Sequence, residues 1–242
     1  MLRFARRGLR VLMYHRVAVD ETAPLTVSVA QLEAQLRWLR AQGFAPISVA
    51  DVVAAAEHQR ALPAQSFLVT FDDGYVDTFE LAQPVLQRLG LRAAVFVPGA
   101  FVGGTSAWDR DAQPLMDAGQ LRALAAEGWE IGLHSHTHRN FRTLTAAAIA
   151  ADVRENFSTL RSLGLVPVSA LAYPYGGRPR AAPDRAAMQT ALREAGVRLA
   201  FRIGNRVNAL PLRAPFEINR LGVRGDRSFA AFQRQIRWGR LL

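Results

Sequence analysis

The chain alternates short apolar runs, typical of buried strands, with longer segments in which apolar residues recur at helical spacing. The first run is Val11 to Tyr14, and Ser28 with Gln31 forms a capping-box pattern that marks the first helix. Further strands are expected at 44–49, 66–71, 92–97, 129–133, 169–173, 197–203 and 216–219, and helices at 28–43, 51–59, 76–89, 120–126, 146–163, 185–194 and 228–238. Seven or eight strand–helix units in succession predict a parallel sheet that closes into a barrel covered by helices.

The length and composition favour one compact unit. The chain has 242 residues, of which 50% are apolar, so it can bury one large core. No linker, low-complexity tract or internal repeat marks a boundary. We therefore expect an α/β fold with a single domain over residues 1–242, built on a barrel of about seven parallel strands. The chain has no cysteine, which excludes disulfide bonds and thiolate metal ligands.

The formal net charge of +10 comes entirely from arginine, because the chain contains no lysine. The arginines are scattered along the sequence and form no block, which indicates a compositional bias and argues against nucleic-acid binding. A basic surface can still attract an anionic polysaccharide or acidic lipid headgroups, an attraction that salt would screen.

The N-terminal segment Met1 to Gly8 is basic, but no apolar stretch long enough for an export signal follows it. No part of the chain approaches the length of about 20 apolar residues that spans a bilayer. We expect a protein without a signal peptide or an integral membrane segment, located in the cytoplasm or at the inner face of the membrane.

Two aspartates and a histidine cluster follow two of the expected strands. Thr70-Phe71-Asp72-Asp73-Gly74 ends one apolar run, and His134-Ser135-His136-Thr137-His138 follows another. The loops after the strands of a barrel converge at one end, so we expect the two motifs to meet there. Two imidazoles and one carboxylate can hold a divalent ion with open positions, and the second carboxylate is then a candidate general base. An isolated Asp-Asp-Gly is an ordinary surface turn, but its combination with the histidines favours metal-assisted hydrolysis.

The two motifs resemble the first two motifs of the polysaccharide deacetylase superfamily, carbohydrate esterase family 4, and Tyr173-Pro174-Tyr175-Gly176 resembles its third. The resemblance covers about residues 11–236. It implies a distorted (β/α) barrel, a bound divalent ion and the removal of acetyl groups from N-acetylated sugars. Carried over position by position, it implies metal ligands at Asp73, His134 and His138, a catalytic base at Asp72, and an oxyanion-stabilising backbone N–H at Tyr175.

His15 follows the first strand and is a candidate general acid. The commonest members of the superfamily carry that acid late in the chain, but this sequence has no histidine after His138. In the circularly permuted subgroup of poly-β-1,6-N-acetylglucosamine deacetylases an early Tyr-His supplies it, and His15 resembles that histidine. An imidazole with a pKa of about 6.5 suits proton donation to a leaving amine. The alternative is a rim histidine hydrogen-bonded to the backbone. His136 is expected to have a supporting role, and His58 to be solvated.

One position departs from the family pattern. Many members carry in the third motif an arginine that orients the catalytic aspartate, and Ala172 occupies the matching position here. Arg220 can substitute for it, or can equally be an exposed arginine among thirty. We also consider Trp108 and Tyr175 as substrate contacts, because aromatic rings commonly stack on sugars, although such rings can equally anchor the core or a loop. Arg220 is a further candidate for a substrate contact.

The predicted function is metal-dependent removal of N-acetyl groups from an N-acetylhexosamine-containing polysaccharide or oligosaccharide in surface or exopolysaccharide biosynthesis. The metal is expected to be zinc, with cobalt, iron or nickel as alternatives. A related amidase or O-acetyl esterase acting on another small substrate is the alternative function, and a non-catalytic carbohydrate-binding protein is the third. A carbohydrate is the expected partner, and the sequence makes no prediction about the oligomeric state.

Overall fold

The computed structural model describes residues 7–239 and contains a closed barrel of seven parallel strands. Around the barrel the strands follow the order β1, β10, β9, β8, β7, β6 and β5, and pairing of β1 with β5 closes it. Their bounds are β1 (Gly8–Tyr14), β5 (Gln65–Asp72), β6 (Ala94–Val97), β7 (Glu130–Leu133), β8 (Ala170–Ala172), β9 (Leu199–Ile203) and β10 (Ile218–Gly222). The predicted (β/α) barrel of about seven strands is confirmed. Residues 1–6, which contain most of the segment considered above as a possible export signal, lie outside the described residues.

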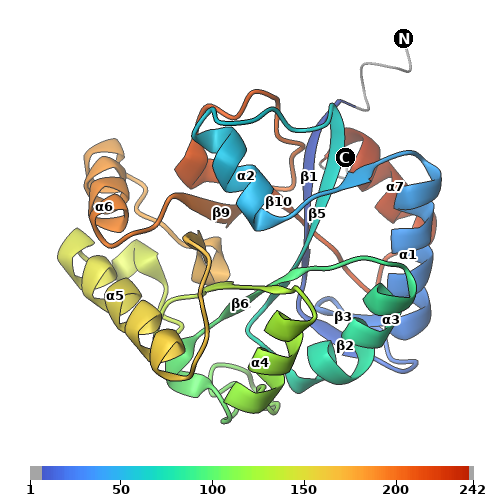
Figure 1. The fold of residues 1–242 in the computed structure, drawn as a ribbon, viewed down its shortest axis with the longest axis horizontal. Helices are drawn as coiled ribbons and strands as arrows, with labels where there is room; N and C mark the ends of the chain where they lie inside the picture. The colour runs from blue at the N-terminus through green and yellow to red at the C-terminus, as the bar shows by residue number, and fades with distance from the viewer. Residues whose placement is uncertain (1–6, 240–242) are drawn as a thin grey trace.

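Helices surround the barrel (Figure 1). The group α1, α3 and α7 lies along one side, and the pair α5 and α6 lies along the opposite side. Their bounds are α1 (Val29–Ala41), α2 (Val49–Ala56), α3 (Gln83–Arg88), α4 (Ala118–Ala126), α5 (Ala146–Ser162), α6 (Ala182–Glu194) and α7 (Phe229–Trp238). Within residues 7–239, no helix combines the length and the apolar character that crossing a bilayer requires.

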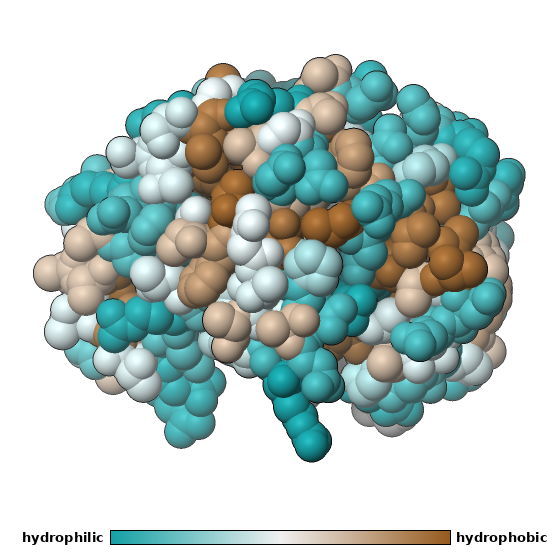
Figure 2. Space-filling view, turned by 90° about the horizontal axis from the view of Figure 1, so that it is seen from below, coloured by the Kyte–Doolittle hydropathy of each residue, from teal (hydrophilic) through white to brown (hydrophobic). Residues whose placement is uncertain are grey.

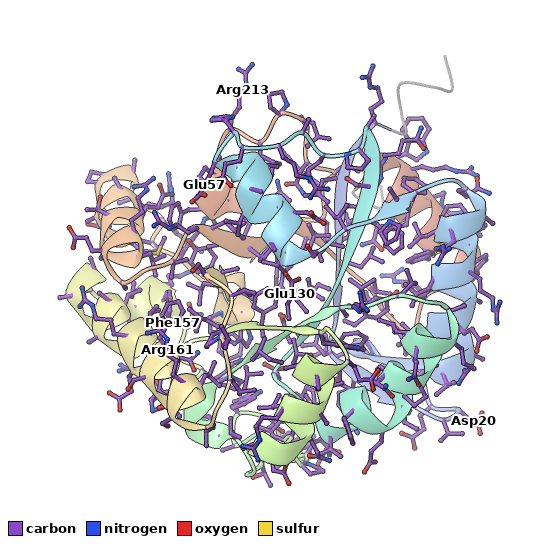
Figure 3. All side chains as sticks on the ribbon, in the orientation of Figure 1. Asp20, Glu57, Glu130, Phe157, Arg161 and Arg213 are labelled. Atoms are coloured by element: carbon purple, nitrogen blue, oxygen red, sulfur yellow. The ribbon has the colours of Figure 1, made fainter. Side chains whose placement is uncertain are left out.

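Helix α2 closes one end of the barrel. Its buried Val49 belongs to the same apolar cluster as Leu9 of β1 and Leu68 of β5. Glu130, the first residue of β7, accepts hydrogen bonds from the backbone N–H groups of Val49 and Ala50 at 2.6 and 2.8 Å, and it lies beside the helix in Figure 3. These hydrogen bonds satisfy donors that a helix leaves free at its first turn. Because Leu9 and Glu130 begin their strands, α2 covers the N-terminal end of the barrel and leaves the C-terminal end to the loops.

The outer core lies between the strands and the surrounding helices. Leu32, Leu36 and Leu39 of α1 are fully buried in it, as the helical spacing predicts. On α5 the buried ring of Phe157 belongs to this core, and the guanidinium of Arg161 lies over it at 5.0 Å (Figure 3). The side of the molecule opposite α2, which faces the viewer in Figure 2, presents hydrophilic and hydrophobic groups intermixed. It has no single continuous apolar face.

The strand expected at 216–219 lies at Ile218–Gly222 (β10), because Pro215–Glu217 forms a 3-10 turn, and Arg220 therefore lies within the strand. Three further elements differ from the expectation. The strand predicted at 44–49 is reduced to β4 (Ala45–Pro46), because Ser48 caps α2 in a reciprocal hydrogen-bond pair with Asp51. The helix predicted at 76–89 begins as a π-helical turn, Thr78–Ala82, which α3 continues. The third difference is a small parallel ribbon of β2 (Arg16–Ala18) and β3 (Thr26–Ser28), which was not predicted because three-residue strands carry almost no periodic signal.

Candidate active site

The two aspartates lie at the C-terminal end of β5. Asp72 is the last residue of the strand, and Asp73 and Gly74 form the following turn with positive φ angles of 71° and 78°. Aspartate tolerates this left-handed conformation better than most side chains, and glycine adopts it freely. The turn sends the two carboxylates to different partners, since Asp72 contacts Arg220 and His15 while Asp73 contacts two imidazoles.

Two polar side chains of α5 hold the histidine loop that follows β7. Asn156 is fully buried and donates a hydrogen bond to the carbonyl of Ser135 at 2.8 Å. Asp152 accepts the backbone N–H of the next residue, also at 2.8 Å. Ser135 and His138 have positive φ angles of 63° and 52°, so the loop adopts the left-handed conformation at two positions. The loop thereby brings His134 and His138 to the same place, without the single helical turn that their spacing also allowed.

Asp73, His134 and His138 form one compact group of potential metal ligands. The Nε2 atoms of His134 and His138 lie 3.2 and 3.1 Å from Oδ1 of Asp73. All three side chains are buried, and their ligand atoms lie within 4.8 Å of one another. The structure thus brings together the three residues that the sequence singled out as ligands.

The hydrogen bonding of this group fits a cation. Nδ1 of His134 lies 2.8 Å from the carbonyl oxygen of Ala172, so Nδ1 of the neutral ring carries the proton and Nε2 presents a lone pair. Oδ1 of Asp73 is buried and has no hydrogen-bond partner among the described residues. If Nδ1 of His138 also carries the proton, three lone pairs converge here without a donor between them, which is the arrangement that a divalent ion satisfies. Burial lowers the pKa of His134, but the charges of Asp72 and Asp73 outweigh it and leave the pKa raised; a cation would offset this negative charge.

Arg220 of β10 pairs with Asp72 through two parallel hydrogen bonds. Nη1 lies 2.6 Å from Oδ1 and Nη2 lies 2.6 Å from Oδ2. Arg220 has no exposed surface, so the alternative of an exposed arginine is wrong, and its side chain is shielded from solvent against Asp72. Burial by itself raises the pKa of Asp72, but the charges of Arg220 and the nearby imidazoles outweigh it, so the pKa lies below its ordinary value. Asp72 is therefore ionised and fixed, although Ala172 occupies the position where the family pattern has arginine.

His15 lies directly after β1, beside the same carboxylate. Its Nε2 lies 3.9 Å from Oδ2 of Asp72, and its side chain is 14% exposed. Its Nδ1 is buried and has no hydrogen-bond partner in residues 7–239. The alternative of a rim histidine hydrogen-bonded to the backbone is therefore not supported at this nitrogen. The next two residues are anchored to Asp77, which pairs with Arg16 at 3.0 Å and accepts the backbone N–H of Val17 at 3.1 Å. These contacts attach the segment after His15 to the segment after Asp73.

Aromatic rings cover the metal-ligand group on its outer side. Trp108 stacks on the ring of His138 with a centroid distance of 3.9 Å, and Tyr175 approaches it edge-on at 4.8 Å. Tyr175 has a positive φ of 57° and is 55% exposed. A hydrogen bond of 2.7 Å from Tyr75 to Asp109 holds the loop that carries Trp108. Both rings predicted to contact substrate therefore lie at the candidate site.

The remaining histidines lie apart from it. His136 points away from Asp73, with Nε2 3.9 Å from Glu155 of α5, and His58 lies exposed after α2. Sequence reasoning missed the loop-holding residues Asn156 and Asp152. The one available signal was an asparagine at a position of α5 where the helical period requires an apolar side chain.

The chain is similar in sequence to known proteins of one family. A sequence profile of the polysaccharide deacetylase family matches residues 59–200. YxkH of Bacillus subtilis (strain 168) is 24% identical over 168 residues, which are 69% of this chain and 57% of YxkH. The poly-beta-1,6-N-acetyl-D-glucosamine N-deacetylase of Escherichia coli (strain K12) is 34% identical over 98 residues, 39% of this chain and 14% of that protein. The chain thus spans only part of the length of these curated relatives.

Solved structures share the fold. IcaB from Ammonifex degensii superposes with a TM-score of 0.78 at 23% identity, covering 96% of this chain and 97% of that one. The Streptococcus pyogenes deacetylase PplD gives a TM-score of 0.77 at 17% identity, covering 95% and 98%. The profile match covers more than half of the chain, and the chain therefore belongs to the polysaccharide deacetylase family, a family of hydrolases that act on carbon–nitrogen bonds other than peptide bonds.

Proposed function

We propose that this protein removes N-acetyl groups from an N-acetylhexosamine-containing oligosaccharide or polysaccharide in a metal-dependent hydrolysis. One observation supports this proposal most directly. The buried carboxylate of Asp72, ionised by its arginine partner, lies next to a separate group of ligand side chains, Asp73, His134 and His138. Metal-assisted amide hydrolysis requires both of these parts, a cation site and an independent base.

The residues Asp73, His134 and His138 would hold the ion, and their two nitrogens and one oxygen suit zinc first and cobalt, iron or nickel next. When bound, such an ion polarises the acetyl carbonyl and makes water more acidic.

The chain's own residues supply the proton transfers. Asp72 accepts the proton of the attacking water, and Arg220 holds that carboxylate in one orientation. His15 donates a proton to the sugar nitrogen as the carbon–nitrogen bond breaks. The backbone N–H of Tyr175 stabilises the negative charge that develops on the carbonyl oxygen. The products are acetate and a free amine on the sugar, so that one water molecule is consumed for each acetyl group.

The relatives narrow the proposed substrate. The Escherichia coli relative and one from Staphylococcus aureus (strain MRSA252) are both named as deacetylases of poly-beta-1,6-N-acetyl-D-glucosamine. We therefore propose a β-1,6-linked N-acetylglucosamine polymer or oligomer as the first substrate to test, with a role in surface or exopolysaccharide biosynthesis. The exposed ring of Tyr175 and the indole of Trp108 provide surfaces on which a sugar can stack.

The test is acetate release from β-1,6- and β-1,4-linked N-acetylglucosamine oligomers by metal-stripped protein, with and without added Zn²⁺ or Co²⁺. We expect release that depends on the metal and that falls by on the order of a hundredfold or more in Asp72→Asn. Release only from O-acetylated sugars would replace the proposal with an esterase. Glycan binding without release in metal-loaded protein would replace it with a non-catalytic function.

A further inference from the structure

A cavity of about 350 Å³ lies at the C-terminal ends of β9 and β10. Its lining residues include Arg202, Ile203, Gly222, Arg224, Arg227 and Phe232. Because the C-terminal ends of the strands also carry the two aspartates and His15, this cavity belongs to the same rim as the candidate active site.

Two contacts join the cavity to the candidate active site. On one side, Ile203 packs against Gly176, the residue after Tyr175, so closely that a Cβ on Gly176 would lie 3.0 Å from the Ile203 side chain. On the other side, Gly222 pairs in register with Met13, two residues before His15. The cavity therefore borders both the third-motif loop and the strand that carries the candidate general acid.

The charge of the cavity wall is positive. Three of the lining residues are arginines, and none is acidic. Arg202 shares Glu217 with another arginine, and its own Nε is buried without a hydrogen-bond partner in residues 7–239. Arg224 pairs with Asp226, whereas Arg227 makes no salt bridge or hydrogen bond within the described residues. The cavity thus has guanidinium groups that its acidic neighbours do not fully neutralise.

The same wall has apolar parts. The side chains of Ile203 and Phe232 lie among the arginines, and Ile203 is partly exposed. Guanidinium groups bind carboxylate and phosphate oxygens through paired hydrogen bonds, and apolar side chains pack against the face of a sugar ring. A volume at the lower end of the range for small-molecule sites has room for one substituted sugar residue.

We infer that this cavity is a subsite for a sugar residue that carries an oxyanion, either a carboxylate or a phosphate ester, next to the acetylated residue. The preferred substrate is then an anionic glycan, which the net charge of +10 would also attract. This inference rests on the proposed deacetylase function for its placement of the acetylated sugar.

The experiment measures binding separately from turnover. Asp72→Asn, in which turnover should be lower by on the order of a hundredfold or more, is titrated by calorimetry with three N-acetylglucosamine oligomers of equal length: a neutral one, one with an adjoining uronate and one with an adjoining phosphate ester. We expect the anionic oligomers to bind about tenfold more tightly than the neutral one, the gain of roughly one charge-assisted contact. The stronger of the two anionic ligands identifies the charged group.

Arginine variants test whether the anionic group binds in this cavity. Adding Arg224→Gln and Arg227→Gln should bring the Kd ratio of anionic to neutral oligomer close to one. Arg213→Gln is the matched control, because Arg213 is an exposed arginine on the side of the molecule where α2 lies (Figure 3). Equal Kd values for the three oligomers, or equal effects of the control and the test variants, would overturn the subsite. Acetate release from the neutral oligomer by the unmodified protein tests the proposed function alone, so the two can fail independently.

Discussion

The pair of Asp72 and Arg220 allows a sharp prediction about stability, from the substitution Arg220→Met. Both side chains are buried, and the two hydrogen bonds between them measure 2.6 Å each. Methionine has a comparable length and no charge, so it fills much of the same space. The substitution therefore leaves a buried carboxylate without its cation.

The expected cost follows from that isolated charge. Breaking a buried ion pair by removing one partner costs about 3–5 kcal/mol of unfolding free energy, because the remaining charge is neither hydrated nor paired. The total stability of a domain is commonly about 5–15 kcal/mol, so the variant should fold but be clearly weakened. Arg224→Met is the matched control, since Arg224 makes the same type of two-point pair with Asp226 on the exposed surface, where such pairs contribute little.

The cost should also depend on pH. In the unmodified protein the pKa of Asp72 lies below its ordinary value, so the pair stabilises the fold above about pH 4 and this contribution is lost as the pH falls through the folded pKa. In the variant, burial without Arg220 raises the pKa of Asp72, so the folded state is instead penalised as the pH rises. The difference in unfolding free energy between the two proteins must therefore grow from about pH 4 to pH 7.

Urea denaturation in the presence of a chelator, followed by fluorescence at pH 4, 5.5 and 7, measures this difference. A loss below about 1 kcal/mol at pH 7, or a loss that does not change with pH, would show that Asp72 is not held as a buried ion by Arg220. An equal loss of unfolding free energy in Arg224→Met would also refute the reasoning, because the cost of removing the arginine would then not depend on whether the ion pair is buried.

Three further predictions follow from the same site. Asp72→Asn should bind Zn²⁺ almost as tightly as the unmodified protein but lower kcat by on the order of a hundredfold or more, measured by metal analysis and acetate release; loss of metal would mean that the two aspartates have exchanged roles. His15→Gln should lower kcat on N-acetylated sugars by about a hundredfold while sparing 4-nitrophenyl acetate, whose leaving group needs no proton; equal losses on both substrates would exclude a general acid. Asn156→Leu leaves the Gly99 N–H and the carbonyl of Ser135 without a partner, while the carbonyl of Val97 still accepts the N–H of His134, and should cost about 2 kcal/mol or more of unfolding free energy in urea denaturation; a neutral effect would show that the histidine loop does not depend on Asn156.

The sequence determined the local features of this protein. The spacing of apolar residues located the strands and helices of the barrel, and Ser28 with Gln31 marked the start of α1 where the structure has its capping box. It also indicated that Asp72 and Asp73 end a strand. These features depend on neighbours in the chain, whose backbone preferences and periodicity act over a few residues. The predictions of a strand at 44–49 and of a regular helix at 76–89 were wrong in detail. Competing local signals, such as the helix cap at Ser48, overlap in such segments.

Only the tertiary structure decided which distant side chains meet. Asp72 and Arg220 are separated by 148 residues, and the sequence left open whether Arg220 reaches Asp72 or is an exposed arginine among thirty. Its partner follows from the closure of the barrel, in which β10 lies beside β1 and β1 lies beside β5. The same closure puts His15 next to Asp72, and it places the arginine-lined cavity at the C-terminal end of the barrel, where the candidate active site also lies. Strand register and closure are set by the packing of the whole core, so the pairing of remote residues is a property of the folded barrel and cannot be read from any local stretch of the chain.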